Sequence, residues 1–430
     1  MSFQTGLSGL NASSRSLDVI GNNIANANTT GMKSSRAEFS NLVASSLGVG
    51  STAGAGIGVT VAAVSQQFSQ GNISTTGNTM DVAINGGGFF QLTQTDGSSA
   101  YTRDGSFKLD KDGYIKTNSG ANVMGFPTDK TGTVTSASIQ KIQLPTNAPI
   151  NANATTKITA EFNLDARALD ATQSAAAGKT AAPRSTYGTA LDVYDSQGVA
   201  SPVKLYFQKT DTIKNSWDIY GGIDGVPLAT DVYPNLGTMT FDATGKINPS
   251  APPATGFSIN LAAGTIPSAN PNDAVSAGGT GFLTKDISLD LSNVTQYGTA
   301  YAVSSLTQDG YTAGELTGVS IGETGLITSK YSNGQSQFTG QITLADFRNV
   351  QGLQPIGGNA WTATFASGLP VQGAPGAGKF GSLRAGALED SNVDLTSELV
   401  NMMTAQRAYQ ANAQTIKTQD QIMSTLVNLR

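Results

Sequence analysis

The sequence predicts a mixed, mainly β protein with α-helical ends: a coiled-coil-like terminal domain plus two nested all-β domains joined by flexible linkers. Three observations lead to this prediction. Apolar residues recur at alternating four- and three-residue steps near both ends of the 430-residue chain, which is typical of helices that bury one seam. Strand-like alternation with Gly-containing turns fills the region between them. Gly-, Ala- and Ser-rich stretches separate each predicted helix from the β-rich body.

The first predicted element is a helix from about Ser2 to Ala27, and Asn28 to Gly31 form its stop signal. An amphipathic stretch from Arg36 to Leu47 follows. A Gly-rich segment then predicts a flexible linker. We assign residues 1–70 to the N-terminal helix and linker of the terminal domain. The apolar stripe of the helix is Phe3, Leu7, Leu10, Leu17 and Ile24, and the linker glycines are Gly48, Gly50, Gly54, Gly56 and Gly58.

The β-rich body divides into three segments. Residues 71–145 predict the first part of a middle β domain, residues 146–294 an inserted outer β domain, and residues 295–365 the second part of the middle domain, because their strand texture resembles the first part. The turn pairs Asn85-Gly86, Asp104-Gly105 and Asp112-Gly113 each predict a hairpin. In the outer domain, residues 195–198 and 242–245 predict turns, and residues 249–279 an irregular loop.

The chain is expected to end in a second linker, residues 366–386, and a C-terminal helix within residues 387–430. Ser391 and Asp394 have the spacing of a capping box. No Pro or Gly follows them, so the helix would extend on the order of 55 Å. The linker glycines are Gly373, Gly376 and Gly378, and the apolar stripe of the helix includes Leu395, Leu399, Met402, Tyr409, Ile416 and Met423.

Composition excludes several functional classes. Charged residues make up only 13% of the chain and the net charge is −5, which argues against a nucleic-acid partner. The chain has no Cys and no His, so it lacks thiolate metal ligands, disulfides and the commonest general base. We expect no catalytic, cofactor-binding or metal site. Paired carboxylates are the remaining route to hydrolysis, but most acidic residues stand beside Gly in turn-like sequence.

Two motifs that resemble functional sites have simpler interpretations. The segment from Gly373 to Lys379 fits a phosphate-binding loop, but Phe380 replaces the required Ser or Thr and the setting is a linker. Arg103 beside Asp104 is interpreted as a surface ion pair. The N-terminus lacks the pattern of a cleavable signal peptide, and no apolar run is long enough to span a bilayer. These observations alone would predict a cytoplasmic protein.

The two terminal stripes allow two interpretations. Apolar residues at helical spacing usually form the core of their own chain. Here, however, the predicted linkers would let each helix leave its β body, and this favours assembly between copies. We therefore predict that the stripe residues form a self-assembly interface and that the linker glycines act as hinges.

Several segments resemble one known family, the axial rod and hook proteins of the bacterial flagellum. Near the N-terminus these are residues 17–31 with Lys33 and Arg36; in the β body, residues 81–90 and 101–105; and near the C-terminus, residues 391–395, 398–402 and 406–418. Within this family, the chain length and the inserted β domain favour the hook proteins over the shorter rod proteins. The segments around residues 308–311, 331–334 and 359–361 are also similar to hook proteins.

The resemblance implies a structural subunit and no enzyme. Such subunits polymerise into the hook, a curved hollow helical tube that acts as a universal joint and transmits torque from rod to filament. The implied partners are further copies in a homopolymer, the distal rod protein, the hook–filament junction protein, the hook cap and the flagellar type III export apparatus. Neither nucleic-acid binding nor membrane insertion is implied.

The resemblance also replaces the cytoplasmic expectation. It implies a hook outside the cell, continuous with the basal body, whose subunits are exported without a cleaved signal peptide. A distal rod protein or another axial protein is the alternative. A more remote alternative is a secreted β-rich carbohydrate-binding protein or hydrolase with helical oligomerisation arms.

Overall fold

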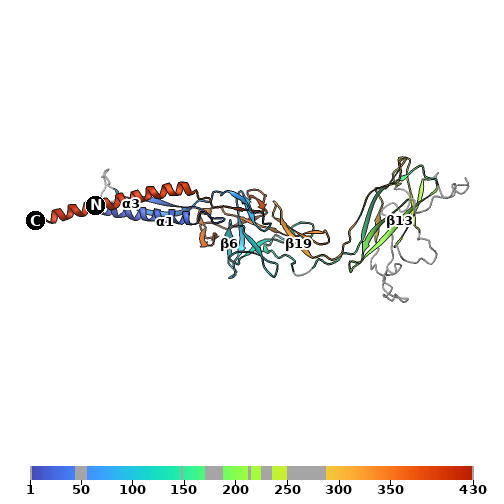
Figure 1. Cartoon of the computed structure of the whole chain (residues 1–430), viewed down its shortest axis with the longest axis horizontal. Coiled ribbons are helices and arrows are strands. Elements are labelled where there is room, and N and C mark those ends of the chain that lie inside the picture. Colours follow the sequence, from blue (N-terminus) through green and yellow to red (C-terminus); the bar gives the residue numbers. More distant parts are fainter. Residues whose placement is uncertain are drawn as a thin grey trace. The chain divides into compact units, whose positions relative to one another are not determined.

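The computed structural model describes residues 2–43, 56–146, 149–169, 187–211, 215–223, 235–248 and 287–428. It divides into two compact units that are nested in the sequence (Figure 1). The first unit contains Met1–Asn147, Thr317–Lys330 and Ser336–Arg430, and the second contains Ala148–Leu316 and Tyr331–Gln335. The described chain is mainly β with a helix near each end, so the predicted fold class is confirmed.

The terminal helices are α1 (Ser2–Ala25) and α3 (Leu395–Asn428). At about 1.5 Å per residue, α3 is about 50 Å long, close to the prediction. Its N-cap is Asp394, whose carboxylate accepts the backbone N–H of Thr396 at 2.9 Å and of Ser397 at 3.3 Å. The predicted capping box at Ser391 is therefore wrong, and the helix begins later than expected. Among the described residues, neither helix is long and apolar enough to cross a membrane.

A β-hairpin follows α1. Strand β1 (Ser35–Val43) pairs antiparallel with β2 (Gly56–Gln66). The amphipathic stretch that begins at Arg36 is thus a strand as far as Val43, and residues 44–47 lie outside the described residues. Gly56 and Gly58, predicted as linker glycines, belong to β2. Gly48, Gly50 and Gly54 lie outside the described residues, so the structure does not test their hinge role.

The β body of the first unit has one large sheet, in which β19-β20-β21-β9-β5-β6-β24-β23 form the main path, and two small sheets, β26-β4 and β27-β3. Strands on both sides of the insertion pair with one another, as predicted for a discontinuous domain. The bounds before the insertion are β3 (Ile73–Thr75), β4 (Val82–Asn85), β5 (Phe89–Thr93), β6 (Ser99–Thr102), β7 (Phe107–Leu109), β8 (Ile115–Thr117), β9 (Asn122–Phe126) and β10 (Gln140–Lys141). After it they are β19 (Leu316–Ile321), β20 (Leu326–Tyr331), β21 (Ser336–Ile342), β22 (Leu344–Asp346), β23 (Gln354–Gly357), β24 (Ala360–Thr362), β25 (Val371–Gly373), β26 (Ser382–Ala385) and β27 (Ala387–Glu389), with a short 3₁₀ helix at Val350–Gly352.

Adjacent phenylalanines on β5 serve two separate cores. Successive side chains of a strand point to opposite faces of the sheet. Phe90 packs in a cluster with Val82, Phe107 and Leu344, whereas Phe89 packs in a second cluster with Trp361. The sheet is therefore buried on both faces at this point, which explains the run of apolar residues on β5.

Of the three predicted hairpins in this body, one is confirmed. Asp112-Gly113 lies in the turn between β7 and β8, where the N–H of Gly113 donates to the carbonyl of Asp110. The hairpin predicted at Asn85-Gly86 is wrong, because β4 pairs with β26 rather than with β5. The one at Asp104-Gly105 is wrong as well, because β6 pairs with β5 and β24. Long-range partners take precedence over the local turn signal at both places.

The predicted second linker is part of the folded unit. Strand β25 pairs with β22, and β26 pairs with β4. The ring of Phe380 occupies the space where a Cβ at Gly373 would lie, and Gly376 and Gly378 have φ of 79° and 60°. These three glycines thus serve close packing and left-handed turns, and flexibility does not explain them. Strand β27 precedes the C-terminal helix, which leaves residues 387–394 outside it.

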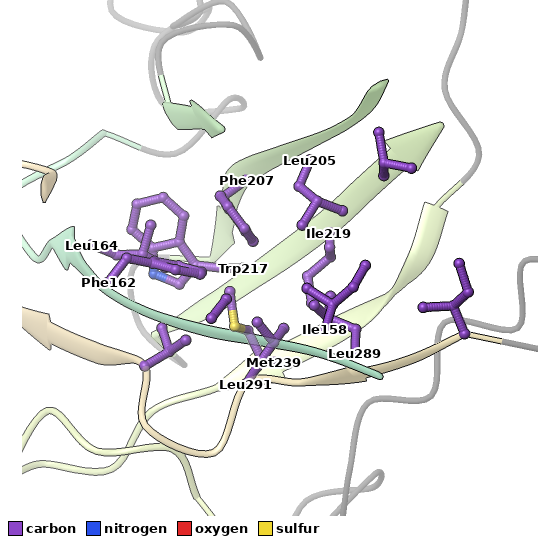
Figure 2. Close-up of a cluster of buried hydrophobic side chains, with 14 of the residues drawn as sticks. Ile158, Phe162, Leu164, Leu205, Phe207, Trp217, Ile219, Met239, Leu289 and Leu291 are labelled. Carbon is purple, nitrogen blue, oxygen red and sulfur yellow. The ribbon is translucent and has the colours of Figure 1, made fainter. Parts of the chain in front are cut away.

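The second unit consists of two packed sheets. One contains β16-β11-β17 with β18 beside β11, and the other contains β12-β13-β14-β15. Their facing sides supply one hydrophobic cluster, in which Ile158 and Phe162 from one sheet meet Phe207 and Trp217 from the other (Figure 2). The bounds are β11 (Lys157–Asp165), β12 (Gly188–Tyr194), β13 (Ala200–Asp211), β14 (Ser216–Ile223), β15 (Asn235–Thr240), β16 (Ser288–Asp290), β17 (Thr295–Tyr297) and β18 (Ala302–Gln308).

The second unit extends further along the chain than predicted. Strands β17 and β18, which were assigned to the middle domain, both pair with β11. The predicted turns at 195–198 and 242–245 are confirmed by hydrogen bonds from Gly198 to Asp195 and from Gly245 to Asp242. The predicted irregular loop, residues 249–279, lies outside the described residues.

Candidate functional site

The candidate site is the surface of the two terminal helices, which lie side by side and antiparallel (Figure 1). A Cβ added to Gly6 would lie 3.2 Å from Cγ1 of Ile416, and one added to Gly9 would lie 2.9 Å from the amide of Asn412. At the other end of α1, Asn23 donates to Glu398 at 3.4 Å. The two helices approach closely because α1 presents residues with no side chain at these positions.

The face of α1 that meets α3 differs from the predicted stripe. It carries Gly6, Gly9 and Ser13, whose Oγ is 3.4 Å from Nδ2 of Asn412, and then Asn23. At about 100° per residue, this face lies roughly a quarter turn from the predicted apolar stripe. The apolar pattern does not mark this face, because its residues are small or polar. The recurrence of small side chains at three- and four-residue steps is the signal that could have found it.

The predicted stripe on α1 is consequently only partly covered. Leu7 is 44% exposed, and Leu10, Leu17 and Ile24 are half-buried. Phe3 lies in α1, but its side chain is outside the described residues. The chain's own fold therefore leaves apolar surface along this helix.

The predicted stripe on α3 is more exposed. Met402 and Ile416 are half-buried, whereas Leu395, Leu399, Tyr409 and Met423 are exposed, with Leu399 at 51%. Other large apolar side chains of α3 are exposed as well, namely Val400, Met403 and Ile422. Apolar residues on a soluble helix usually face a core, so this row of side chains indicates a surface that another molecule covers.

The hairpin β1–β2 packs on α1. The N–H of Val59 donates to Ser8 Oγ at 3.3 Å, and Gly58, with φ of 134°, lies against the same side chain. Asn23 is buried and holds the start of β1 by two hydrogen bonds. Its Nδ2 donates to the carbonyl of Ser35 at 2.8 Å, and its Oδ1 accepts the N–H of Ser35 at 2.9 Å. The hairpin and the helix pair thus form one packed assembly.

A buried cluster of charges joins this assembly to the β body. Lys33 Nζ donates to Glu389 Oε1 at 2.6 Å and to the carbonyl of Ser69 at 2.7 Å. Arg103 donates to Glu389 Oε2 at 3.1 Å, and Glu389 Oε1 also accepts the N–H of Gly71 at 2.9 Å. We call Lys33, Arg103 and Glu389 the charge junction. The side chains of Lys33 and Glu389 are fully buried and that of Arg103 is 6% exposed.

Burial dominates the electrostatics of the charge junction. Loss of hydration lowers the pKa of Lys33 below its ordinary value, and the attraction of Glu389 opposes this shift. Burial likewise lowers the pKa of Arg103, and the attraction of Glu389 again opposes the shift. Two cations share one anion here, so the stability of the cluster depends on the Glu389 carboxylate.

The charge junction corrects one prediction about Arg103. This side chain was expected to form a surface pair with Asp104, but it is buried and pairs with Glu389. Asp104 instead accepts a hydrogen bond from Thr30 Oγ1 at 2.9 Å, which helps to hold the segment after α1. The helices are thus anchored to the β body by the segment after α1, the loop after β6 and strand β27. Within the described ranges, no group of three or more His, Cys, Asp or Glu residues is arranged to hold a metal ion.

Four family models match successive parts of the chain. The model described as flagella basal body rod protein matches residues 3–33, and flagellar hook protein FlgE/F/G D1 domain matches residues 83–160. Flagellar basal body protein FlaE D2 domain matches residues 163–311, and flagellar basal body rod FlgEFG protein C-terminal matches residues 384–429. The matches thus include both terminal helices and the inserted unit.

Curated relatives match the chain from end to end. It is 41% identical over 437 residues to the flagellar hook protein FlgE of Salmonella typhimurium strain LT2, and 40% identical over 436 residues to that of Escherichia coli strain K12. Each alignment covers 100% of both chains. Among solved structures, the Helicobacter pylori flagellar hook protein FlgE2 is similar with a TM-score of 0.52 and 16% identity, covering 74% of this chain and 100% of that one. At this identity the likeness concerns the fold alone.

Proposed function

The chain belongs to the family of flagellar hook proteins and is a structural subunit of the hook, and we propose that it polymerises through the apolar faces of its terminal helices. The observation that supports this most strongly is the row of exposed apolar side chains on α3, including Leu395, Leu399 and Tyr409. A second copy that covered this row would remove it from water, at roughly 25 cal/mol for each Å² buried.

The helix pair suits the inner wall of a tube. The α1 side of its own seam uses small residues, so most of the larger apolar side chains of the two helices stay available to neighbouring copies. The charge junction then holds the pair against the β body, so that torque applied to the helices passes into it. We propose that the assembled tube is curved and hollow and acts as a universal joint between rod and filament.

Membership of the family places the protein in the flagellum. We further propose that its hook lies outside the cell and is continuous with the basal body, and that the chain is exported by the flagellar type III apparatus without cleavage of a signal. The proposed partners are the distal rod protein at one end of the polymer, and the hook cap and the hook–filament junction protein at the other. The names of the relatives describe a part of the flagellum and no catalytic activity.

Electron microscopy of the purified full-length protein under polymerising conditions tests the proposal. We expect tubes from the wild type. Leu399→Asp and Leu10→Asp should each abolish tubes, because a charge would be buried at the contact between copies. Ser138→Asp is the control, since it adds the same charge at an exposed position of the β body, away from both terminal helices. Discrete soluble oligomers of the wild type with hydrolase activity would instead support the enzyme alternative.

A further inference from the structure

A groove of about 540 Å³ opens between α1, α3 and the start of β1. Its walls consist mostly of small and polar side chains, including Ser16, Ser35, Thr404 and Ala408. Glu398, in the first turn of α3, supplies a carboxylate to the groove. The groove is thus acidic at one point, and its small side chains leave room for a long side chain to enter.

The Glu398 carboxylate is incompletely satisfied by its own chain. Oε1 accepts one long hydrogen bond, 3.4 Å, from Asn23, whose amide is mainly engaged with Ser35. Oε2 is buried and has no hydrogen-bond partner among the described residues. Arg36 also lines the groove, but its guanidinium donates to Glu38 at 3.0 Å. An unpaired carboxylate oxygen away from water is costly, and a cation that entered the groove would remove this cost.

Arg407 has the position that such a contact between copies requires. It is exposed on α3 and forms no ion pair within the described part of the chain. It follows Glu398 by nine residues, which is about two and a half turns, so the two side chains project from opposite sides of α3. Lys417, the other cationic residue of α3, is a poorer candidate for this contact, because it lies only about a quarter turn around the helix from Glu398. A contact between opposite sides repeats head to tail and builds an open polymer, whereas a contact within one side closes a dimer.

We propose that the groove is an interface between copies, in which the guanidinium of Arg407 from one copy enters and pairs with Glu398 of the next. The proposal rests on the proposed function and specifies one of its contacts. Arg fits this role better than Lys because its planar fork can donate two parallel hydrogen bonds to a carboxylate.

Charge reversal with cross-complementation tests this pairing. Polymerisation of full-length protein is followed by sedimentation and electron microscopy, and the threshold concentration for polymer is measured. We expect Glu398→Arg and Arg407→Glu each to raise the threshold at least about tenfold, the factor that corresponds to about 1.4 kcal/mol. An equimolar mixture of the two variants should return the threshold close to the wild-type value. The first variant carries Arg at both positions and the second carries Glu at both. When the two variants alternate along the polymer, every contact between positions 407 and 398 again joins one Arg with one Glu.

The recovery separates pairing from a folding defect, because two misfolded variants would not restore each other. Lys417→Glu and Asp420→Arg are the matched controls, since they reverse the same charges elsewhere on α3. Their mixture should show no mutual recovery. A wild-type threshold for Glu398→Arg, or a mixture no better than its components, overturns the pairing while leaving the proposed function intact. Failure of the wild type to form tubes would overturn the proposed function itself.

Discussion

Replacement of Glu389 by Gln is the sharpest test of how the first unit is held together. The carboxylate accepts hydrogen bonds from Lys33 at 2.6 Å, Arg103 at 3.1 Å and the backbone of Gly71 at 2.9 Å. Gln keeps the shape and one acceptor oxygen but removes the only negative charge of the charge junction. Lys33 would then remain buried without a counter-charge, and Arg103 would keep only the weaker attraction of Asp346.

The expected cost follows from this geometry. Removing one partner of a buried ion pair typically costs about 3–5 kcal/mol, because the other charge stays buried and unpaired. Because Gln retains one acceptor oxygen, we expect Glu389→Gln to lower the free energy of unfolding by about 3 kcal/mol, the lower end of this range. Domains of this kind are stable by roughly 5–15 kcal/mol, so the loss is a large fraction of the total. A second change, Lys33→Met, should recover part of it because one of the stranded cations is removed.

The two tryptophans of the chain make the assay specific. Trp361 lies in the first unit and Trp217 in the core of the second, and the chain has no other tryptophan. In a Trp217→Phe background, urea unfolding followed by fluorescence therefore reports on the first unit. The matched control is Glu323→Gln, which makes the same chemical change at an exposed position and should stay within about 0.5 kcal/mol.

Two results would refute the reasoning. One is a loss of less than about 1 kcal/mol for Glu389→Gln, which would mean that water or a rearrangement replaces the carboxylate. The other is an equal loss in the transition reported by Trp217 in a Trp361→Phe background. In that case the effect would not be local to the charge junction.

Two further predictions concern acid stability and the folded core. Asp290 accepts hydrogen bonds from Ser292 and pairs with Lys157 at 3.0 Å, which lowers its pKa from 3.8 to about 2. Because the pKa of Asp290 is lower in the folded state than in the unfolded state, this stabilisation is present above about pH 4 and is lost as the pH falls towards 2. Asp290→Asn should therefore reduce the loss of stability between about pH 4 and pH 2, measured by unfolding monitored at Trp217. An unchanged loss would contradict the assignment. Limited proteolysis of the monomer should remove most of α1 and α3, because most of the large apolar side chains of α3 are exposed and a helix pair that buries so little apolar surface is only marginally stable. It should retain residues 366–389, because β26 and β27 are paired within the sheets. Mass spectrometry of the resistant core checks this, and a core that ended near residue 365 would restore the linker interpretation.

Much of the fold was predictable because its signals are local. The heptad spacing in residues 395–427 and the absence of Pro and Gly predicted one long helix, and α3 is that helix. In the outer unit, turn residues predicted the turn between β12 and β13 and the turn after β15, and strands β12 to β15 are neighbours in the sheet in the same order as in the sequence. In these elements the residues that interact are close along the chain, so spacing alone contains the information.

The failures share one physical cause. Glycines in a sequence predict a flexible segment, but Gly58 and Gly373 have another role. The side chains of Ser8 and Phe380 lie so close to them that a Cβ would not fit. A turn pair such as Asn85-Gly86 reads as a hairpin, yet β4 pairs with a strand almost 300 residues later in the sequence. Local sequence patterns cannot predict a contact with a residue that is far away in the sequence.

The sequence by itself determined the family, the helical ends and the nested order, because these depend on motifs, periodicity and composition. Only the tertiary structure decided which residues form each contact. It placed small residues of α1 against α3, left most of the larger apolar side chains of α3 exposed, and brought Lys33, Arg103 and Glu389 together from three distant parts of the chain. A buried charge is stable only with its partner, and that partner is set by the fold.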